Sequence, residues 1–172
     1  MTQKTEQENQ PQFRVLSQYI KDLSFECPKA PALIKSTKQD LGLQVMIQNT
    51  KVDEHHHEVV LKLRGENKGD QDETLFIVEV DYAGLFLIKD MPQEQVGQLL
   101  GIEAPSLLFP FARQALMSVV TDGGFRAPTL EPINFHALYM QQQQQQASSP
   151  LPGAFTPIQA ASNRPLPSLN IA

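Results

Sequence analysis

The sequence contains no tryptophan and a single cysteine, Cys27, among its 172 residues. One thiol cannot form an internal disulfide, so stability must come from an apolar core, which a chain of this length can supply. Long apolar runs are also missing. Leu85–Ile88 with the flanking Gly84 makes a run of only five residues, whereas a membrane-spanning helix needs roughly 18. We therefore expect one reduced, water-soluble domain and no integral membrane protein.

The beginning of the chain has no apolar stretch of the kind that forms an export signal. Its first ten residues, MTQKTEQENQ, are almost entirely polar. A secretory signal needs an apolar core of at least about seven residues. Together with the lone thiol, which suits a reducing compartment, this favours a cytoplasmic location.

Basic residues are scarce in the middle of the chain, and this accounts for the net charge of -5. Residues 65–136 hold 4 basic and 11 acidic side chains and so carry -7 by themselves. A surface of this sign repels a phosphate backbone, and aromatic residues interleaved with Lys or Arg are missing as well. The charge excludes a nucleic-acid partner and leaves two interpretations, a basic protein partner or simple solubility.

Motifs for nucleotide chemistry are absent too. The segment GENKGD has neither the GxxxxGK[ST] spacing nor a strand-to-helix context, and there is no GxGxxG. The segment DEHHHE offers three imidazoles and three carboxylates. Consecutive histidines on a strand point to alternate faces, however, and do not converge on one ion. We expect no catalytic residues, metal or other cofactor, while a small metal-dependent enzyme centred on His55–His57 and a purely structural oligomer remain alternatives.

Composition divides the chain into three parts. Residues 1–12 are polar, residues 13–146 contain the periodic apolar segments, and residues 147–172 follow a run of six glutamines and hold 5 of the 13 prolines. Pro-rich and polar segments cannot bury enough apolar surface to fold alone. We expect a flexible N-terminus at 1–12, a single domain at 13–146 and a disordered tail at 147–172.

Apolar residues alternate at period two in four successive segments, which indicates four half-buried strands. The segments are Leu23–Cys27, Leu41–Ile47, Val59–Leu63 and Thr74–Tyr82. Four strands in succession with short connections favour an antiparallel sheet. The same alternation places Asp22, Ser24 and Glu26 on one face of the first strand, and Ile77, Glu79 and Asp81 on one face of the last.

Helical patterns begin only after these strands. A short helix is predicted from Pro92 to just before Gly101, a longer one over Ser106–Asp122 with Gly123 and Gly124 as its stop, and a last one from Asn134, as N-cap, into the glutamines. The apolar arc of the long helix spans about 180°, whereas about 100° suffices to cover one sheet. The surplus favours a second subunit over a wider fold of the same chain. Strands followed by helices indicate an α+β fold, a four-stranded antiparallel sheet with helices packed on one face.

Four strings, in this order, closely resemble the SecB family of bacterial export chaperones: QYIKDLSFE (Gln18–Glu26), HEVVL (His57–Leu61), LLFPFARQ (Leu107–Gln114) and PTLEPINFHALYM (Pro128–Met140). The resemblance spans 13–146. It implies an ATP-independent holdase that assembles as a homotetramer, a dimer of dimers. Such a protein binds unfolded precursors of secreted proteins and delivers them to the motor ATPase SecA.

The resemblance also implies roles for individual residues. The basic, zinc-bearing tail of SecA would dock on Asp22, Glu26, Ile77 and Glu79. Candidates for lining a client groove are Phe76, Phe135, Leu138 and Tyr139, while the crossover segment Ser36–Asp40 is polar where some relatives carry an aromatic. The residues expected to support the oligomer are Val78, Val80, Tyr82, Phe109 and Leu116.

Overall fold

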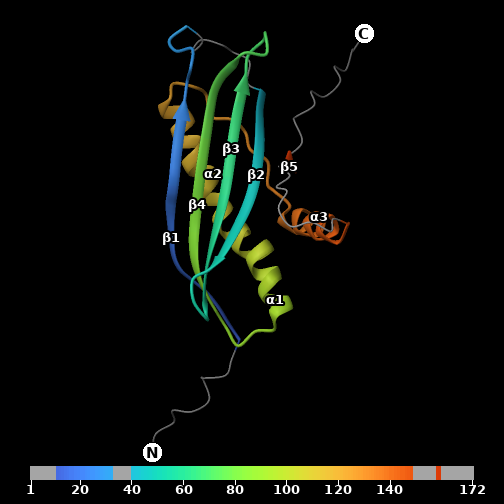
Figure 1. The fold of residues 1–172 in the computed structure, drawn as a ribbon. Helices are drawn as coiled ribbons and strands as arrows, with labels where there is room; N and C mark the ends of the chain where they lie inside the picture. Colours follow the sequence, from blue (N-terminus) through green and yellow to red (C-terminus); the bar gives the residue numbers. More distant parts are fainter. Residues whose placement is uncertain (1–10, 33–39, 149–157, 160–172) are drawn as a thin grey trace, which may run out of the picture.

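The protein forms an antiparallel sheet with helices on one face (Figure 1), as a computed structural model of residues 11–32, 40–148 and 158–159 describes it. The strands are β1 (Gln12–Glu26), β2 (Asp40–Lys51), β3 (His56–Lys68), β4 (Thr74–Lys89) and the two-residue β5 (Ile158–Gln159). The helices are α1 (Gln93–Gln98), the π-helical turn η1 (Leu99–Glu103), α2 (Ala104–Asp122) and α3 (Phe135–Ser148). The predicted α+β fold is confirmed.

The strands lie in the order β1-β4-β3-β2-β5, and every neighbouring pair is antiparallel. The four predicted strands are therefore present, and each is longer than predicted, although β1 ends at Glu26, one residue before the predicted end at Cys27. β5 adds a short fifth strand, since Ile158 and Gln159 pair with Val45 and Gln44. Apart from residues 147, 148, 158 and 159, the predicted tail lies outside the described residues. So do most of the predicted crossover segment Ser36–Asp40 and nearly all of the predicted flexible N-terminus.

The core lies between α2 and the face of the sheet that α2 covers, called here the inner face. α2 runs obliquely across β4 and β3 (Figure 1). It approaches the sheet closely at Gly84, where an added Cβ would overlap Leu108 and Phe86. The fully buried side chains of this layer include Val59, Leu61, Leu63, Val78, Val80, Phe86, Leu108, Leu116 and Val120.

β1 is a long strand interrupted twice. Its register against β4 shifts between Val15 and Ser17, and again between Ile20 and Asp22. Each shift inserts one unpaired residue and so turns the following side chains to the opposite face. The second one, at Lys21, is the reason why Tyr19 and Asp22 both point to the face away from α2, which we call the outer face.

The helices form one almost continuous run from Gln93 to Asp122, so the predicted end before Gly101 is wrong. Gly101 has a packing role instead, because an added Cβ would overlap the ring of Tyr139 on α3. The predicted stop after Asp122 is confirmed, since Gly124 takes a positive φ of 86°. The predicted cap of α3 is confirmed as well, since the Ala137 N–H donates to Asn134 Oδ1 at 3.0 Å.

Candidate functional site

The outer face brings the four predicted docking residues together across two neighbouring strands. In the register of β1 and β4, Glu26 stands opposite Ile77, Ser24 opposite Glu79 and Asp22 opposite Asp81. Directly opposed residues have Cβ atoms about 5 Å apart. The side chains of Asp22, Glu26, Ile77 and Glu79 therefore share one surface, which we call the acidic patch.

Two cations on β3 complete this surface, and sequence reasoning missed them. Lys62 lies opposite Asp81 and Arg64 opposite Glu79 in the register of β3 and β4. Both pairs are joined by side-chain hydrogen bonds, from Lys62 Nζ to Asp81 and from Arg64 Nη1 to Glu79. The alternation in LKLR already puts both cations on the polar side of β3, but only the register reveals which carboxylates they face.

A hollow of about 310 Å³ lies over this part of the sheet. Charged side chains from three strands line it, together with the neutral side chains of β2 beside them. The charged lining residues are Asp22, Lys62, Arg64, Glu79 and Asp81. The hollow thus offers three carboxylates in a concave setting, and two of them, Glu79 and Asp81, lie in ion pairs with cations from β3.

A second cluster on the outer face fixes β1 beside the acidic patch. Tyr19 Oη donates a hydrogen bond to Glu58 Oε1, and Lys21 Nζ lies 2.6 Å from Glu58 Oε2. The bond from Lys21 is the main cause that lowers the pKa of Glu58, and the bond to Glu58 is the main cause that raises the pKa of Tyr19. Glu58 belongs to β3, so these contacts reach across β4 and connect β1 with the centre of the sheet.

The histidines at the start of β3 are held separately. His56 Nδ1 lies 2.8 Å from Asp53 Oδ1. The same oxygen accepts the backbone N–H groups of His55 and His56, and these bonds lower the pKa of Asp53 to about 2. The His57 side chain lies on the inner face, opposite Phe86. Among the described residues, no group of three or more His, Cys, Asp or Glu is arranged to hold a metal ion.

Three of the four predicted client-groove residues lie together on α3. Phe135 packs edge-on against Phe109, with ring centroids 5.8 Å apart. Tyr139 lies over Gly97 and Gly101, and its hydroxyl accepts a hydrogen bond from Gln143 Nε2 at 2.8 Å. Leu138 packs at the edge of the core. α3 is therefore seated on α1 and η1 by its aromatic side chains.

Phe76, the fourth predicted groove residue, lies elsewhere and is only 1% exposed. Its ring stacks on Phe25 at 5.5 Å and lies 4.8 Å from Phe125, just beyond the C-terminus of α2. Phe135, by contrast, packs against the N-terminal half of α2. The structure therefore does not bring Phe76 together with Phe135, Leu138 and Tyr139.

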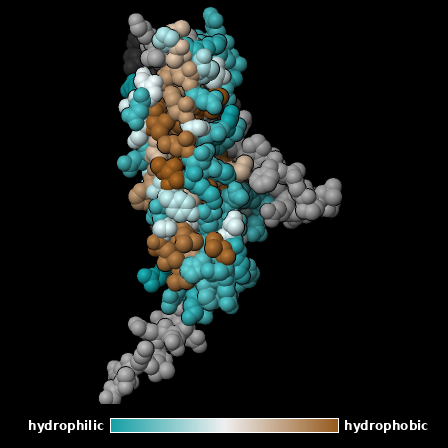
Figure 2. Space-filling view, turned by 60° about the vertical axis from the view of Figure 1, so that its left-hand side comes forward, coloured by the Kyte–Doolittle hydropathy of each residue, from teal (hydrophilic) through white to brown (hydrophobic). Residues whose placement is uncertain are grey.

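Most of the predicted oligomer residues are covered within the single chain. Val78, Val80, Phe109 and Leu116 are buried in the core, and Tyr82 stacks on Phe111 at 6.2 Å. The exposed apolar side chains lie beside them, on the inner face of β1 and on α2. We call this set the apolar strip: Val15, Ile20, Leu23, Leu107 and Phe111, each 37–49% exposed. Figure 2 shows apolar side chains gathered along the β1 side of the molecule.

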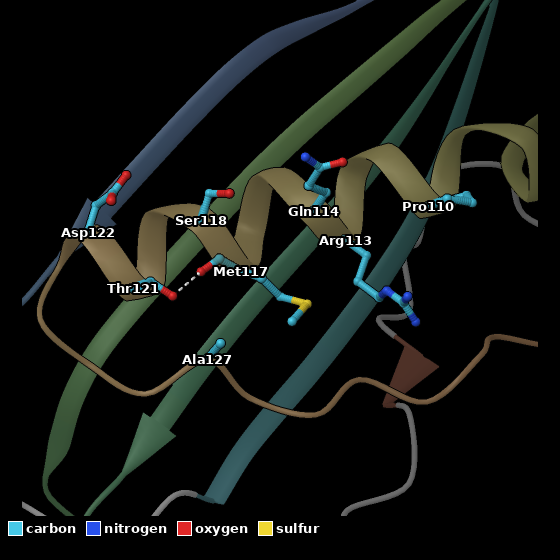
Figure 3. Close-up of a pocket in the computed structure, with 8 residues that line it drawn as sticks. All are labelled: Pro110, Arg113, Gln114, Met117, Ser118, Thr121, Asp122 and Ala127. Carbon is cyan, nitrogen blue, oxygen red and sulfur yellow. Dashed lines mark hydrogen bonds between the residues drawn. The ribbon is translucent and has the colours of Figure 1, made fainter.

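The side of α2 away from the sheet bounds a second cavity of about 640 Å³, together with the segment that follows the helix. Figure 3 shows Arg113, Met117 and Thr121 projecting from α2 on this side, with Ala127 across from them. Thr121 Oγ1 donates to the Met117 carbonyl at 2.9 Å, and Arg113 donates to the Leu130 carbonyl at 3.5 Å. The bond from Thr121 stays within α2, whereas the bond from Arg113 joins the helix to the segment that follows it.

Comparisons with known proteins agree with this architecture. Residues 6–146 match the family described as preprotein translocase subunit SecB. The protein-export protein SecB of Nitrosococcus oceani is 45% identical over 151 residues, which cover 86% of this chain and 91% of that protein. Its counterpart from Zymomonas mobilis is 47% identical over 137 residues, which cover 79% and 83% of the two chains.

A solved structure shares the fold at much lower identity. It is a SecB-like chaperone of Mycobacterium tuberculosis in complex with a ChAD peptide from an antitoxin, with a TM-score of 0.56 and 13% identity. The match covers 70% of this chain and 90% of that one. Among the described residues, no helix is long and apolar enough to cross a membrane.

Proposed function

The chain belongs to the SecB family of protein-export chaperones, and on this premise we propose how its surfaces divide the work of holding and delivering clients. The acidic patch docks SecA, the motor ATPase of the translocase. The apolar surfaces around α3 hold unfolded precursors, and the apolar strip joins copies of the chain into a dimer of dimers. The chaperone works in the cytoplasm without ATP, catalytic residues or a cofactor.

The observation that carries the docking proposal is the convergence of Asp22, Glu26, Ile77 and Glu79 on one open face of the sheet. Two of them lie on β1 and two on β4, and the register makes them neighbours. No helix covers this side of the sheet (Figure 1), at least over the part of the chain that the structure describes. Carboxylates around one apolar side chain suit a partner segment that is basic and partly apolar.

Client binding is supported by the way α3 is attached. Tyr139 packs against the glycines of α1 and η1, and Phe135 packs against Phe109 of α2. The rest of α3 carries the run of glutamines. An extended client gains about 25 cal/mol for each Å² of apolar surface that it buries, with little demand on its sequence. Such an apolar surface can bind many different precursors firmly, because binding depends little on their sequences. Phe76 would join this site only if the cluster around Phe125 opened.

Assembly is supported by the apolar strip. Its five large apolar side chains are each 37–49% exposed, and exposed apolar side chains gathered in one patch are typical of a protein–protein interface. α2 passes mainly over β4 and β3 and touches β1 far less, so Val15, Ile20 and Leu23 on the inner face of β1 remain exposed. A second copy that covered β1 and Phe111 would bury the surplus apolar arc of α2. If two such dimers associate, the protein in solution has a mass of about four chains.

The docking proposal is tested by reversing two charges on the acidic patch. The double variant Asp22→Lys with Glu79→Lys should lose SecA binding, because two attractive contacts become repulsive ones. Its affinity for an unfolded precursor should stay as in the unmodified chain, since both positions lie on the outer face. Isothermal titration with SecA, and separately with the precursor, measures both. Full SecA affinity in the double variant would place the docking site elsewhere.

A further inference from the structure

Arg64 forms an ion pair with Glu79, one of the carboxylates of the proposed docking site. It lies directly opposite Glu79 and donates a hydrogen bond to it. Asp22 and Glu26, on β1, make no side-chain ion pair within the part of the chain that the structure describes. A basic partner therefore meets two available carboxylates and one that is held by the protein itself.

The two cations of β3 differ in what they neutralise. Asp81, the partner of Lys62, stands directly opposite Asp22, and like charges in this position destabilise a sheet. Lys62 thus relieves a repulsion that is built into the strands. Glu79, by contrast, stands opposite the uncharged Ser24. The pair of Arg64 with Glu79 has no such repulsion to relieve.

The Arg64–Glu79 pair is also the one that a partner can reach. Its side chains are 45% and 39% exposed, against 35% and 20% for Lys62 and Asp81. Exposed ion pairs are weak, because water screens them and both side chains lose freedom. A cation from outside can therefore replace Arg64 at little cost, whereas Asp81 is less accessible and remains with Lys62.

We propose that Arg64 is an internal competitor at the docking site, which holds Glu79 in the free chaperone and releases it when a basic side chain of SecA arrives. Docking is then an exchange of one ion pair for another, which lowers affinity and favours release after delivery. This inference rests on the proposed function, because it assumes that SecA docks on the acidic patch. It adds Arg64 as the residue that sets how tightly the partner is held.

The variant Arg64→Gln tests this, with Lys89→Gln as its matched control. Each change removes one positive charge, Arg64 from β3 and Lys89 from β4, and both cations lie in exposed ion pairs. Lys89 is ten residues along β4 from Glu79, or about 33 Å. In titrations with SecA, Arg64→Gln should bind about two- to fivefold more tightly than the unmodified chain. Lys89→Gln should change affinity much less.

A double-mutant cycle shows whether the effect passes through Glu79. In a Glu79→Gln background, Arg64→Gln should give little or no gain, because the carboxylate for which Arg64 competes is gone. The affinity of Arg64→Gln should also fall more steeply with salt, since docking then forms an ion pair without breaking one. Thermal unfolding should shift little, as expected for an exposed pair, so the variants remain folded.

The possible outcomes separate the two proposals. If the unmodified chain binds SecA but Arg64→Gln matches Lys89→Gln, or binds more weakly, Arg64 is no competitor and the inference fails while the docking face stands. An equal gain in the Glu79→Gln background would also overturn it, because Arg64 would then act only by general repulsion. Failure of every variant, the unmodified chain included, to bind SecA would remove the proposed docking function and this inference together.

Discussion

Asp22 reaches the outer face because one extra residue, Lys21, interrupts the alternation of β1. Before this bulge Tyr19 points outward, and after it Asp22 does so as well, opposite Asp81. Lys21 and Tyr19 both contact Glu58, which lies two strands away on β3. At the scale of single residues, the acidic patch proposed as the docking site therefore depends on a backbone irregularity that side-chain contacts hold in place.

His57 is the residue through which acid should weaken the fold. Its Nδ1 is buried without a hydrogen-bond partner among the described residues, and its neighbours across the sheet are Lys51 and Phe86. Burial first, and the charge of Lys51 second, lower its pKa from the ordinary value of 6.5. The unfolded chain then takes up a proton at a higher pH than the folded chain. The free energy of unfolding therefore falls as pH drops from 6.5 towards the folded pKa.

We expect the variant His57→Leu to lose most of this acid sensitivity. Urea unfolding at about pH 7.5 and about pH 5.5 measures it, since the carboxylates whose pKa is lowered, Glu58 among them, titrate below this window. The unmodified chain should lose stability between the two conditions, and His57→Leu should lose less. The exposed His136 on α3 provides the control, because His136→Gln should behave as the unmodified chain does. Equal losses in all three proteins would contradict the role of His57.

At the scale of elements, α3 is held mainly by Tyr139 seated over two glycines one helical turn apart. An added Cβ at Gly101 would overlap the Tyr139 ring, and one at Gly97 would lie 3.1 Å from its hydroxyl oxygen. Both glycines lie inside the helical run of α1 and η1, where glycine is otherwise unfavourable by about 1 kcal/mol. The close approach of the tyrosine explains why they are tolerated there.

The variant Gly101→Ala should therefore loosen α3 while leaving the sheet intact. Overpacking of this kind costs about 1–3 kcal/mol, which exceeds the gain in helix propensity. Hydrogen exchange should show faster exchange of the α3 amides, unchanged protection in β3 and β4, and a lower affinity for an unfolded precursor. Gly42→Ala is the matched control, because the nearest atom to its Cβ would be 3.8 Å away, an ordinary contact. Unchanged protection of α3 in Gly101→Ala would refute this account of its attachment.

The sequence predicted these elements well wherever periodicity was uninterrupted. The alternation in β4 and the Asn134 cap of α3 gave the correct faces and the correct helix start. The full length of β1 was missed because two bulges break its period, and the end assigned before Gly101 was wrong because glycine there serves packing. The pairing of Arg64 with Glu79 depends on strand register, which a single strand's sequence does not encode.

At the scale of the whole molecule, the protein separates its surfaces by the two sides of one sheet. The outer face carries the acidic patch and its cations, while the helices and the apolar strip lie on the inner side and at the β1 edge. A partner on the outer face and clients or further copies on the other side would not compete for the same residues. This separation suits a chaperone of the SecB family, which would have to keep a client bound while a second protein binds the chaperone to receive that client.

The most direct measurement is light scattering from a chemically denatured secretory precursor that is diluted with and without this protein, in the absence of nucleotide. We expect scattering to fall towards zero as the ratio of assembled chaperone to precursor approaches one to one. The double variant Asp22→Lys with Glu79→Lys should suppress scattering equally well, because its changes lie on the outer face, away from the surfaces proposed to hold clients. Scattering that stays the same with and without the protein would contradict a holdase function for this chain.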